Sequence, residues 1–273
     1  MPISLPADLS STLDAAWRAT APIPGFLTQP EARLLGCFAA LAPASGCIVE
    51  IGSFKGRSTT MLATVAAHYG KSSSVAPAAA ENAVAVVAID PHNSPVLLAQ
   101  GSSSFDDFQR NIAPLAAHVQ VHRAFAADVA PTWNRPIRLL WIDGDHSYAG
   151  AKSDLDGFLP HLAPGGIVAF HDALHEFEGP IRVFVQDVLA SPRFGPAGFV
   201  GSIAWAQLRP ADGGRFTAAR AALARRAGPL VPLLAGLQDG RKLSGLRKLR
   251  FKLARARVPR RAVSPAALAG LLG

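Results

Sequence analysis

The sequence predicts a doubly wound α/β domain over residues 27–210, with helices on both faces of a mostly parallel sheet. Short apolar runs, typical of strands buried on both faces, alternate there with segments of helical periodicity. Two of these runs, Ile137–Ile142 and Ile167–Phe170, end abruptly in acidic and imidazole side chains. With the helix expected between them they form a parallel βαβ unit, so their polar ends should meet at one edge of the sheet, where such folds bind ligands.

The expected elements follow one another in a regular alternation. In chain order they are an irregular N-terminal segment (1–26) with a short helix at Asp8–Thr20, a helix from Thr28, a strand from Cys47, a helix to Tyr69, a Ser- and Ala-rich surface loop at Gly70–Asn82, a strand at Val84–Asp90, a loop at Ser94–Ser104, a helix at Ser104–Ile112, strands at Val119–Phe125 and Ile137–Ile142, a helix at Ala149–Leu162, a strand at Ile167–Phe170, a helix at Pro180–Ala190 and an edge strand at Phe199–Leu208.

Residues at the element ends justify several of these bounds. Thr28 and Glu31 form a capping-box pattern before a periodic apolar run, so a helix should begin there. The run Pro164-Gly165-Gly166 is expected to stop the helix that starts at Ala149. The glycine pair after Asp212 marks the boundary beyond which the charge of the chain changes sign.

The net charge of +8 is unevenly distributed. Residues 212–273 hold 14 Lys or Arg and two Asp, whereas the first 211 residues carry a net charge of −4. The basic helical C-terminal extension (211–273) therefore carries any partner that the charge implies. Nucleic acid is disfavoured as that partner, because the first 211 residues are acidic and no aromatic-studded basic strand is present.

A basic amphipathic helix is expected at Arg241–Val258. Four leucines fall on one helical face: Leu243, Leu246, Leu249 and Leu253. This pattern suggests docking on an anionic membrane surface or an acidic protein, although Arg250 and Arg257 intrude on the apolar arc. Packing of the same helix on the core or on a second subunit, as a homo-oligomer, is the alternative.

Composition also indicates the compartment. No apolar run approaches the ~20 residues that span a bilayer, and the N-terminus lacks the pattern of a secretory signal. The two cysteines, Cys37 and Cys47, fall in a predicted helix and a predicted strand, which favours reduced core thiols over a disulfide or metal pair. We therefore expect a cytoplasmic protein that is peripheral to a membrane at most.

A glycine-rich turn follows the first strand and reads Glu50-Ile-Gly52-Ser-Phe-Lys-Gly56. Glycines at such a turn let the backbone approach a ligand, and the spacing differs from both the Gly-x-Gly-x-x-Gly and P-loop patterns. The turn is therefore interpreted as a ligand-binding loop, and the alternative is a tight turn of an unrelated fold that binds nothing. Asp90 ends the second strand, where a carboxylate would accept ribose hydroxyls or else cap the following turn.

Four blocks of sequence resemble, in order, the class I S-adenosylmethionine (SAM) methyltransferases of methyltransferase domain family twenty-four. They are Gly25–Leu35, Ile48–Thr59, Ile142–Tyr148 and Pro164–Asp172. That group is akin to macrocin-type sugar O-methyltransferases and, more remotely, to catechol and caffeoyl-CoA O-methyltransferases. The resemblance covers residues 25–208 and implies a Rossmann-like sheet with SAM as cofactor. The cofactor-binding residues that we expect are Glu50, Gly52, Ser53, Gly56, Arg57, Ser58, Asp90, Phe125 and Ala126.

The polar strand ends predict where the chemistry occurs. A hydroxyl that attacks a sulfonium methyl must lose its proton and be held in line, and a hard divalent cation helps with both. We expect Asp143, His171 and Asp172 to bind a metal or the substrate. An imidazole ligand suits Mn²⁺, Fe²⁺ or Zn²⁺ better than Mg²⁺, so the identity of the metal, and whether one binds, stay open.

Asp145 and His146 are the candidates for the general base, because either can reach a hydroxyl bound beside Asp143. The resemblance to sugar O-methyltransferases favours Asp145, the second acid of Asp-Gly-Asp. Capping of the helix from Ala149 is the alternative role for both.

Together these features predict a SAM-dependent O-methyltransferase that acts, with divalent-metal assistance, on a hydroxyl of a small molecule or glycan. A metal enzyme resembling cephalosporin hydroxylases is one alternative. A non-catalytic platform recruited through its basic tail is the other.

Overall fold

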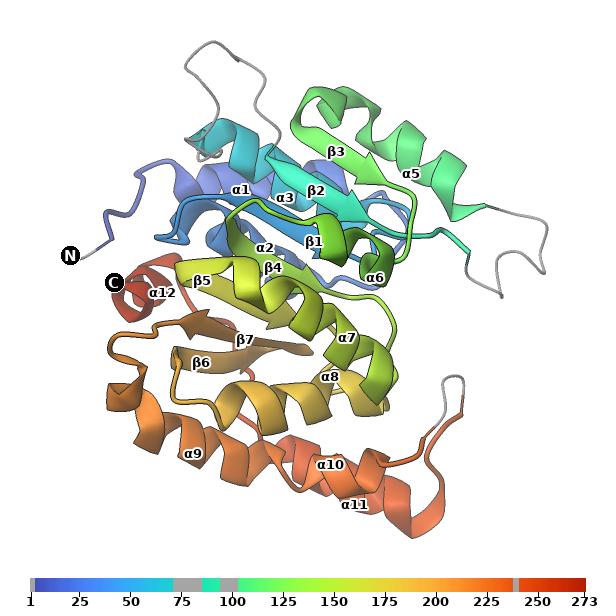
Figure 1. Cartoon of the computed structure of the whole chain (residues 1–273), viewed down its shortest axis with the longest axis vertical. Helices are drawn as coiled ribbons and strands as arrows, with labels where there is room; N and C mark the ends of the chain where they lie inside the picture. Colours follow the sequence, from blue (N-terminus) through green and yellow to red (C-terminus); the bar gives the residue numbers. More distant parts are fainter. Residues whose placement is uncertain (1–2, 71–84, 94–102, 238–240) are drawn as a thin grey trace.

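The computed structural model describes residues 3–70, 85–93, 103–237 and 241–273 (Figure 1). Its centre is a seven-stranded sheet in the order β3-β2-β1-β4-β5-β7-β6. The strands are β1 (Cys47–Ile51), β2 (Val86–Ile89), β3 (Val119–His122), β4 (Ile137–Ile142), β5 (Leu162–Phe170), β6 (Phe194–Val200) and β7 (Ile203–Leu208). Strands β1 to β5 pair in parallel, and β7 is antiparallel to both of its neighbours. The predicted doubly wound fold class is confirmed.

Helices cover both faces of this sheet. They are α1 (Leu9–Thr20), α2 (Gln29–Leu41), α3 (Arg57–Tyr69), α5 (Ser104–Ile112), α6 (Ala126–Val129), α7 (Tyr148–Phe158), α8 (Glu178–Val183), α9 (Thr217–Ala227), α10 (Leu230–Leu234), α11 (Gly245–Ala256) and α12 (Pro265–Leu272). Helix α8 continues in wider, π-type turns to Leu189. The predicted loop at Gly70–Asn82 lies outside the described residues apart from Gly70, and the predicted loop at Ser94–Ser104 does so apart from Ser103 and Ser104.

Alternating side chains of the central strands supply two hydrophobic cores. On β4, Leu140 and Ile142 join the core beneath α6 to α11, whereas Leu139 and Trp141 join the core beneath α1, α2, α3, α5 and α12. The strand is buried on both faces, as its unbroken apolar run predicts. Among the described residues, Cys37 and Cys47 are both buried free thiols.

The predicted start of the second helix is confirmed at its cap. The backbone N–H of Thr28 donates a hydrogen bond of 2.9 Å to Oε2 of Glu31, which satisfies one of the amides that a helix start leaves without a partner. The predicted N-terminal helix is also present, as α1.

Two predicted element bounds in the middle of the chain are wrong. The run Pro164-Gly165-Gly166 does not stop a helix, because α7 ends at Phe158 and β5 already begins at Leu162. A short 3₁₀ turn with Pro160 at its start makes the transition, since proline removes the donor that another α-helical turn needs. Strand β3 ends at His122, three residues earlier than predicted.

The predicted edge strand Phe199–Leu208 is instead the end of a hairpin. Strands β6 and β7 are joined through Gly201 and Ser202, and Gly201 adopts a left-handed backbone with φ of 59°. A two-residue hairpin turn requires such a conformation, which glycine adopts without strain. Strand β7 therefore lies inside the sheet, and β6 forms the edge.

The basic C-terminal extension packs against the rest of the domain. In Figure 1, α9, α10 and α11 lie along the end of the molecule opposite β3. Their apolar side chains belong to the core beneath α6 to α8, whereas Leu268 and Leu272 of α12 pack in the opposite core. The Gln207 side chain on β7 donates a hydrogen bond of 2.9 Å to the carbonyl of Leu272. No helix within the described ranges combines the length and the apolarity that crossing a membrane requires.

Candidate active site

The turn between β1 and α3 is packed against the end of β4. Gly52 and Gly56 both have φ of 86°, and the Gly52 amide donates a hydrogen bond of 2.9 Å to the carbonyl of Ile89. A Cβ on Gly52 would overlap the backbone carbonyl of Asp143, so only glycine fits. The close approach of these backbones places the turn directly beside the acidic end of β4.

Asp90 organises this turn from the end of β2. Its Oδ2 accepts hydrogen bonds of 2.8 Å from the amides of Ser53 and Phe54, and its Oδ1 accepts one of 2.6 Å from the His92 amide. The carboxylate thus caps the neighbouring turns, which was the alternative to ribose binding. Binding of ribose by the same side chain stays a prediction.

Glu50 lies beneath the turn and not on its surface. The side chain is fully buried and accepts hydrogen bonds from the hydroxyls of Ser58 and Thr59 at the start of α3. Burial raises the pKa of Glu50 to about 8, against the lowering effect of these two hydrogen bonds. Glu50 and Ser58, both predicted to hold the cofactor, therefore contact each other and fix the first turn of α3.

Arg57, another predicted cofactor residue, also bonds within the protein. Its guanidinium donates a hydrogen bond of 2.6 Å to the carbonyl of Gly25 and lies 5.2 Å from the Trp17 ring centroid. This contact ties the N-terminal segment to the glycine-rich turn. The neighbouring Phe26 is 82% exposed and stacks on Phe54 of the turn, with ring centroids 6.3 Å apart.

Among the residues that the structure describes, Phe26 and Phe125 are the phenylalanines with exposed side chains. Phe125 is 55% exposed and precedes α6, whereas the strand that it was predicted to end stops at His122. Ala126 is buried in the core. Adenine binding by Phe125 and Ala126 stays a prediction. Phe26 was not singled out in the sequence, although it lies in the first of the resembling blocks.

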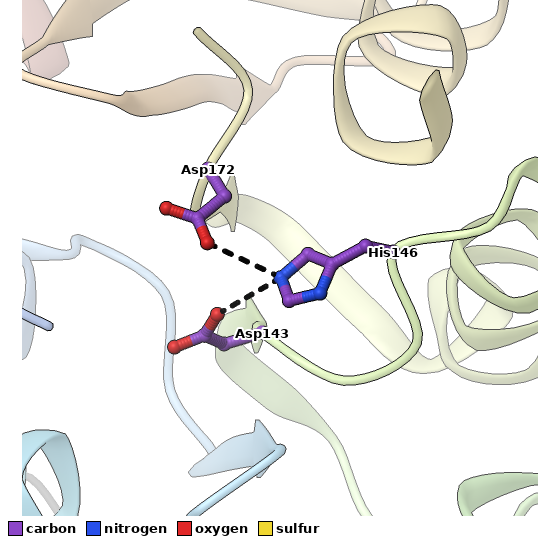
Figure 2. A group of neighbouring side chains, drawn as sticks. All are labelled: Asp143, His146 and Asp172. Carbon is purple, nitrogen blue, oxygen red and sulfur yellow. Dashed lines mark ion pairs between the residues drawn. The ribbon is translucent and has the colours of Figure 1, made fainter. Parts of the chain in front are cut away.

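Asp143, His146 and Asp172 come together at the carboxyl edge of the sheet (Figure 2). Asp143 follows β4, Asp172 follows β5 and His146 lies on the loop before α7. The imidazole Nε2 of His146 is 3.7 Å from Oδ1 of Asp143 and 3.4 Å from Oδ2 of Asp172. We call these three residues the acidic-histidine group. The convergence of the two strand-end acids, predicted from the parallel sheet, is confirmed.

The acidic-histidine group concentrates negative charge around one nitrogen. Burial lowers the pKa of His146, but the adjacent carboxylates of Asp143 and Asp172 outweigh it and raise that pKa to about 10. Nε2 of His146 is buried and makes no hydrogen bond to the described residues. The space between the three side chains therefore suits either a proton on that nitrogen or a divalent cation with two carboxylate ligands and one imidazole ligand.

His171, predicted as a metal ligand, lies behind this group. Its Nδ1 is 3.2 Å from carboxylate oxygens of both Asp143 and Asp172, while its Nε2 faces Glu31 at 3.9 Å. The side chain is only 2% exposed and packs against the Trp141 ring. The next residue, Asp172, has a left-handed backbone with φ of 55°, and its carboxylate remains in contact with the His171 imidazole. Metal binding by His171 stays a prediction, and His146 is a further imidazole that could complete a metal group with the two acids.

Glu31 is a buried partner of the site that the sequence did not reveal. Its Oε1 accepts hydrogen bonds of 2.6 Å and 2.7 Å from the amide and hydroxyl of Ser202, in the β6–β7 turn. Burial raises the pKa of Glu31, but the nearby His171 imidazole and hydrogen bonds from Thr28 and Ser202 outweigh it and hold that pKa below its ordinary range. Glu31 is therefore an anion that faces His171 from the side opposite the acidic-histidine group. Its capping-box position was visible in the sequence, but its partners 140 and 171 residues away were not.

Asp145 does not point into the acidic-histidine group. Its two carboxylate oxygens accept hydrogen bonds of 2.8 Å and 3.0 Å from the amide and hydroxyl of Ser147. The Ser147 hydroxyl in turn accepts a hydrogen bond of 3.0 Å from Gly150, in the first turn of α7. The side chain of Asp145 thus stabilises the start of that helix, which was the alternative to its predicted role as base.

Residues after Asp172 connect the acidic-histidine group to the C-terminal extension. Phe177 stacks on the His146 imidazole with centroids 4.3 Å apart. The Glu176 carboxylate accepts a hydrogen bond of 2.8 Å from the amide of Leu243 and lies 3.8 Å from Nζ of Lys248. The segment that connects β5 to α8 is therefore held between the acidic-histidine group and the region of α11. The irregular sequence after Asp172 did not reveal this relationship.

Comparison with known proteins is consistent with this architecture. Residues 49–173 match the family model described as a methyltransferase domain. The O-methyltransferase from Bacillus cereus in complex with SAH is 22% identical, with a TM-score of 0.51, and the match covers 76% of this chain and 93% of that chain. A putative O-methyltransferase from Klebsiella pneumoniae is 18% identical, with a TM-score of 0.51 and coverage of 76% and 92%.

The O-methyltransferase NovP is 14% identical, with a TM-score of 0.55 and coverage of 74% of this chain and 100% of that chain. At such identities the similarity to solved structures shows a shared fold. The family match is informative about the site as well as the fold, because the matched residues run from within β1 to just beyond Asp172. Residues 49–173 are therefore similar to a methyltransferase domain, and this matched segment contains the entire acidic-histidine group.

Proposed function

We propose that the protein transfers a methyl group from SAM to a hydroxyl of a small molecule or glycan, with a divalent cation bound by the acidic-histidine group. One observation carries the proposal: the glycine-rich turn after β1 and the acidic end of β4 are packed so closely that Gly52 has no room for a side chain beside Asp143. A methyl donor on the turn would thus adjoin an acceptor held by the acids. The methyltransferase family match supports the reaction class.

SAM, when bound, would supply an electrophilic methyl carbon on a positively charged sulfur. The turn suits a ligand because Gly52 and Gly56 keep side chains away from it and Asp90 holds two of its amides in place. The exposed rings of Phe26 and Phe125 would cover apolar parts of the cofactor. Glu50 and Ser58 would act from below by fixing the first turn of α3.

A bound divalent cation would supply Lewis acidity that lowers the pKa of a hydroxyl beside it. Asp143, His146 and Asp172 would hold the cation, and the buried, unbonded Nε2 of His146 is the observation that supports this ligand set. Without the cation, the His146 imidazole is protonated near neutral pH, because its pKa is raised to about 10. In that state His146 orients the two carboxylates and has no capacity to accept another proton.

Asp143 is the residue that we propose takes the proton from the acceptor hydroxyl. Its side chain is 24% exposed, compared with 12% for Asp172, so it is the more accessible of the two carboxylates. Asp145 is less suited, because both of its oxygens accept hydrogen bonds from Ser147. The sequence-based preference for Asp145 or His146 is thus replaced in this proposal by Asp143.

Calorimetric titration of SAM into the purified chain tests the cofactor proposal. We expect micromolar binding, worth about −8 kcal/mol, which is lost in Gly52→Ala and retained in Gly214→Ala. The second glycine is the matched control, since a Cβ there would meet no atom within 4 Å. Wild-type protein that binds no SAM in the presence or absence of Mg²⁺ or Mn²⁺ would refute the proposal.

Metal assistance needs a separate measurement. Electron paramagnetic resonance of free Mn²⁺ during titration into EDTA-treated protein should show one binding site that is lost in Asp172→Asn and kept in Asp106→Asn, an exposed acid on α5. A panel of catechols and sugars assayed by SAH release then identifies the acceptor class. Undiminished turnover in EDTA would remove the cation from the reaction while leaving methyl transfer intact.

A further inference from the structure

Helix α11 has a second apolar face that points to solvent. Phe251 and Ala254 are 2% and 6% exposed and pack into the core. The three leucines of the outer face, Leu246, Leu249 and Leu253, are 60%, 53% and 55% exposed. Their spacing of three and four residues places them in one row, which we call the leucine ridge. A contiguous row of exposed large apolar side chains is typical of an interaction surface.

Basic residues surround the leucine ridge. Residues 241–273 contain ten Lys or Arg and no Asp or Glu. On and just after α11, the exposed side chains of Arg250, Lys252 and Arg257 make no hydrogen bond or ion pair with any residue that the structure describes. By helical spacing Arg250 lies four residues from Leu246, and Arg257 lies four residues from Leu253. The ridge is thus flanked by positive charge that nothing in the described fold neutralises.

We propose that the leucine ridge, with Arg250, Lys252 and Arg257, docks on the surface of an anionic lipid bilayer. Leucines of an interfacial helix bury at the boundary between headgroups and acyl chains, and flanking basic side chains reach lipid phosphates. The charge of this face is complementary to an anionic membrane. The docking does not depend on the proposed methyl transfer.

A second copy of the chain is a poorer occupant of the same face. In a two-fold symmetric contact each surface meets itself, so the basic flanks of the two ridges would face one another. Like charges held together at an interface are unfavourable. A protein partner of acidic character would satisfy the charge, and the experiment below distinguishes it from a membrane.

The inner side of α11 contacts the segment next to the acidic-histidine group. Arg255 on its inner side donates a hydrogen bond of 3.3 Å to the carbonyl of Leu174, and Lys248 lies 3.8 Å from Glu176. Leu174 and Glu176 belong to the segment whose Phe177 stacks on His146. Helix α11 therefore has the proposed docking face on one side and contacts the segment beside the acidic-histidine group on the other.

Co-sedimentation of the full chain with lipid vesicles tests the proposal. We expect binding to vesicles of phosphatidylcholine mixed with phosphatidylglycerol, little binding to phosphatidylcholine alone, and release by added salt. Substitution of all three ridge leucines by Ser should weaken binding at least about tenfold. The control is Leu5→Ser/Leu271→Ser, which removes two leucines that are 41% and 45% exposed outside α11 and should leave binding unchanged.

Circular dichroism melting of each variant shows whether it is folded, and exposed positions should tolerate serine. Replacement of Arg250, Lys252 and Arg257 by Gln provides an independent test, which should abolish the preference for anionic vesicles. Equal binding by wild type and the serine variant would overturn the proposal. So would an absence of vesicle binding together with capture of poly-glutamate, or a dimer in analytical ultracentrifugation that the serine substitutions dissociate.

Discussion

The ring of Phe177 lies on the imidazole of His146, with their planes 20° apart. Phe177 comes from a segment that the C-terminal extension holds through Glu176 and Leu243, so residues late in the chain determine the position of a side chain in the acidic-histidine group. The basic extension is therefore connected to the site, and its contribution can be measured at these contacts.

Replacing Phe177 by Ala should lower kcat for methyl transfer by about tenfold, because His146 loses the ring that fixes its orientation. The Kd for SAM should not change, since Phe177 stacks on His146, which the proposal assigns to the cation and not to SAM. Steady-state release of SAH and calorimetry measure the two quantities. Phe177→Tyr, which keeps the stacking ring, should restore kcat. An alanine variant with the kcat of wild type would show that the stacking has no role in catalysis.

Asp143 and Asp145 should respond differently to the same chemical change. Asp143→Asn should reduce turnover by about 10²–10⁴-fold, because it removes the proposed base and a cation ligand. Asp145→Asn should retain most activity and destabilise the fold by about 0.5–2 kcal/mol, because its carboxylate stabilises the start of α7. Paired kinetics and denaturant unfolding measure both effects. Loss of turnover in Asp145→Asn with an intact fold would return the role of base to Asp145.

Glu50 should make the stability of the protein depend on pH. Its pKa is raised by burial from 4.5 to about 8, so the folded protein holds this proton more tightly than the unfolded chain does. The resulting stabilisation is complete below the unfolded pKa and is lost as pH rises through the folded pKa. Glu50→Gln cannot ionise and should therefore be more stable relative to wild type at about pH 9 than at about pH 5.

Thermal unfolding of wild type and Glu50→Gln at the two pH values measures this difference. Asp106→Asn is the control, because that carboxylate is exposed on α5 and its substitution should shift the melting temperature equally at both pH values. A Glu50→Gln shift that does not vary with pH would contradict the raised pKa.

The last helix should contribute to the stability of the whole domain. Leu268→Ala should cost about 2–5 kcal/mol of unfolding free energy, because Leu268 is fully buried in the core beneath α2. Leu271, on the same helix, is 45% exposed, and its replacement by Ala should have little effect. Urea unfolding of both variants checks the pair. Equal stabilities would show that α12 is not part of the cooperative unit.

Local patterns were sufficient for most of the fold. The unbroken apolar run Ile137–Ile142 predicted β4 with its observed ends, and the Thr28 capping box predicted the start of α2. Errors arose where glycine and proline allow more than one local structure. Gly165 lies in β5 and not in a helix stop, and Gly201 makes a hairpin turn inside what looked like one strand.

In the site, too, some features followed from local sequence and others depended on the tertiary structure. The convergence of Asp143 and Asp172 followed from the sequence, because carboxyl ends of neighbouring parallel strands share one edge. The presence of His146 as a second imidazole beside the two acids did not follow in the same way, since it depends on the path of the loop before α7. The contact of Glu31 with Ser202 joins residues 171 positions apart, and no local pattern contains it.

The sequence by itself determined the fold class, the acidic strand ends and a basic amphipathic helix, because each depends on spacing within a short segment. Only the tertiary structure decided which face of that helix is buried. Phe251 and Ala254 occupy the core together with Leu243, whereas the other three leucines that periodicity marked as an apolar face remain exposed. Periodicity identifies a face, but the side chains that fit the space left by the packed sheet and helices determine which face is covered.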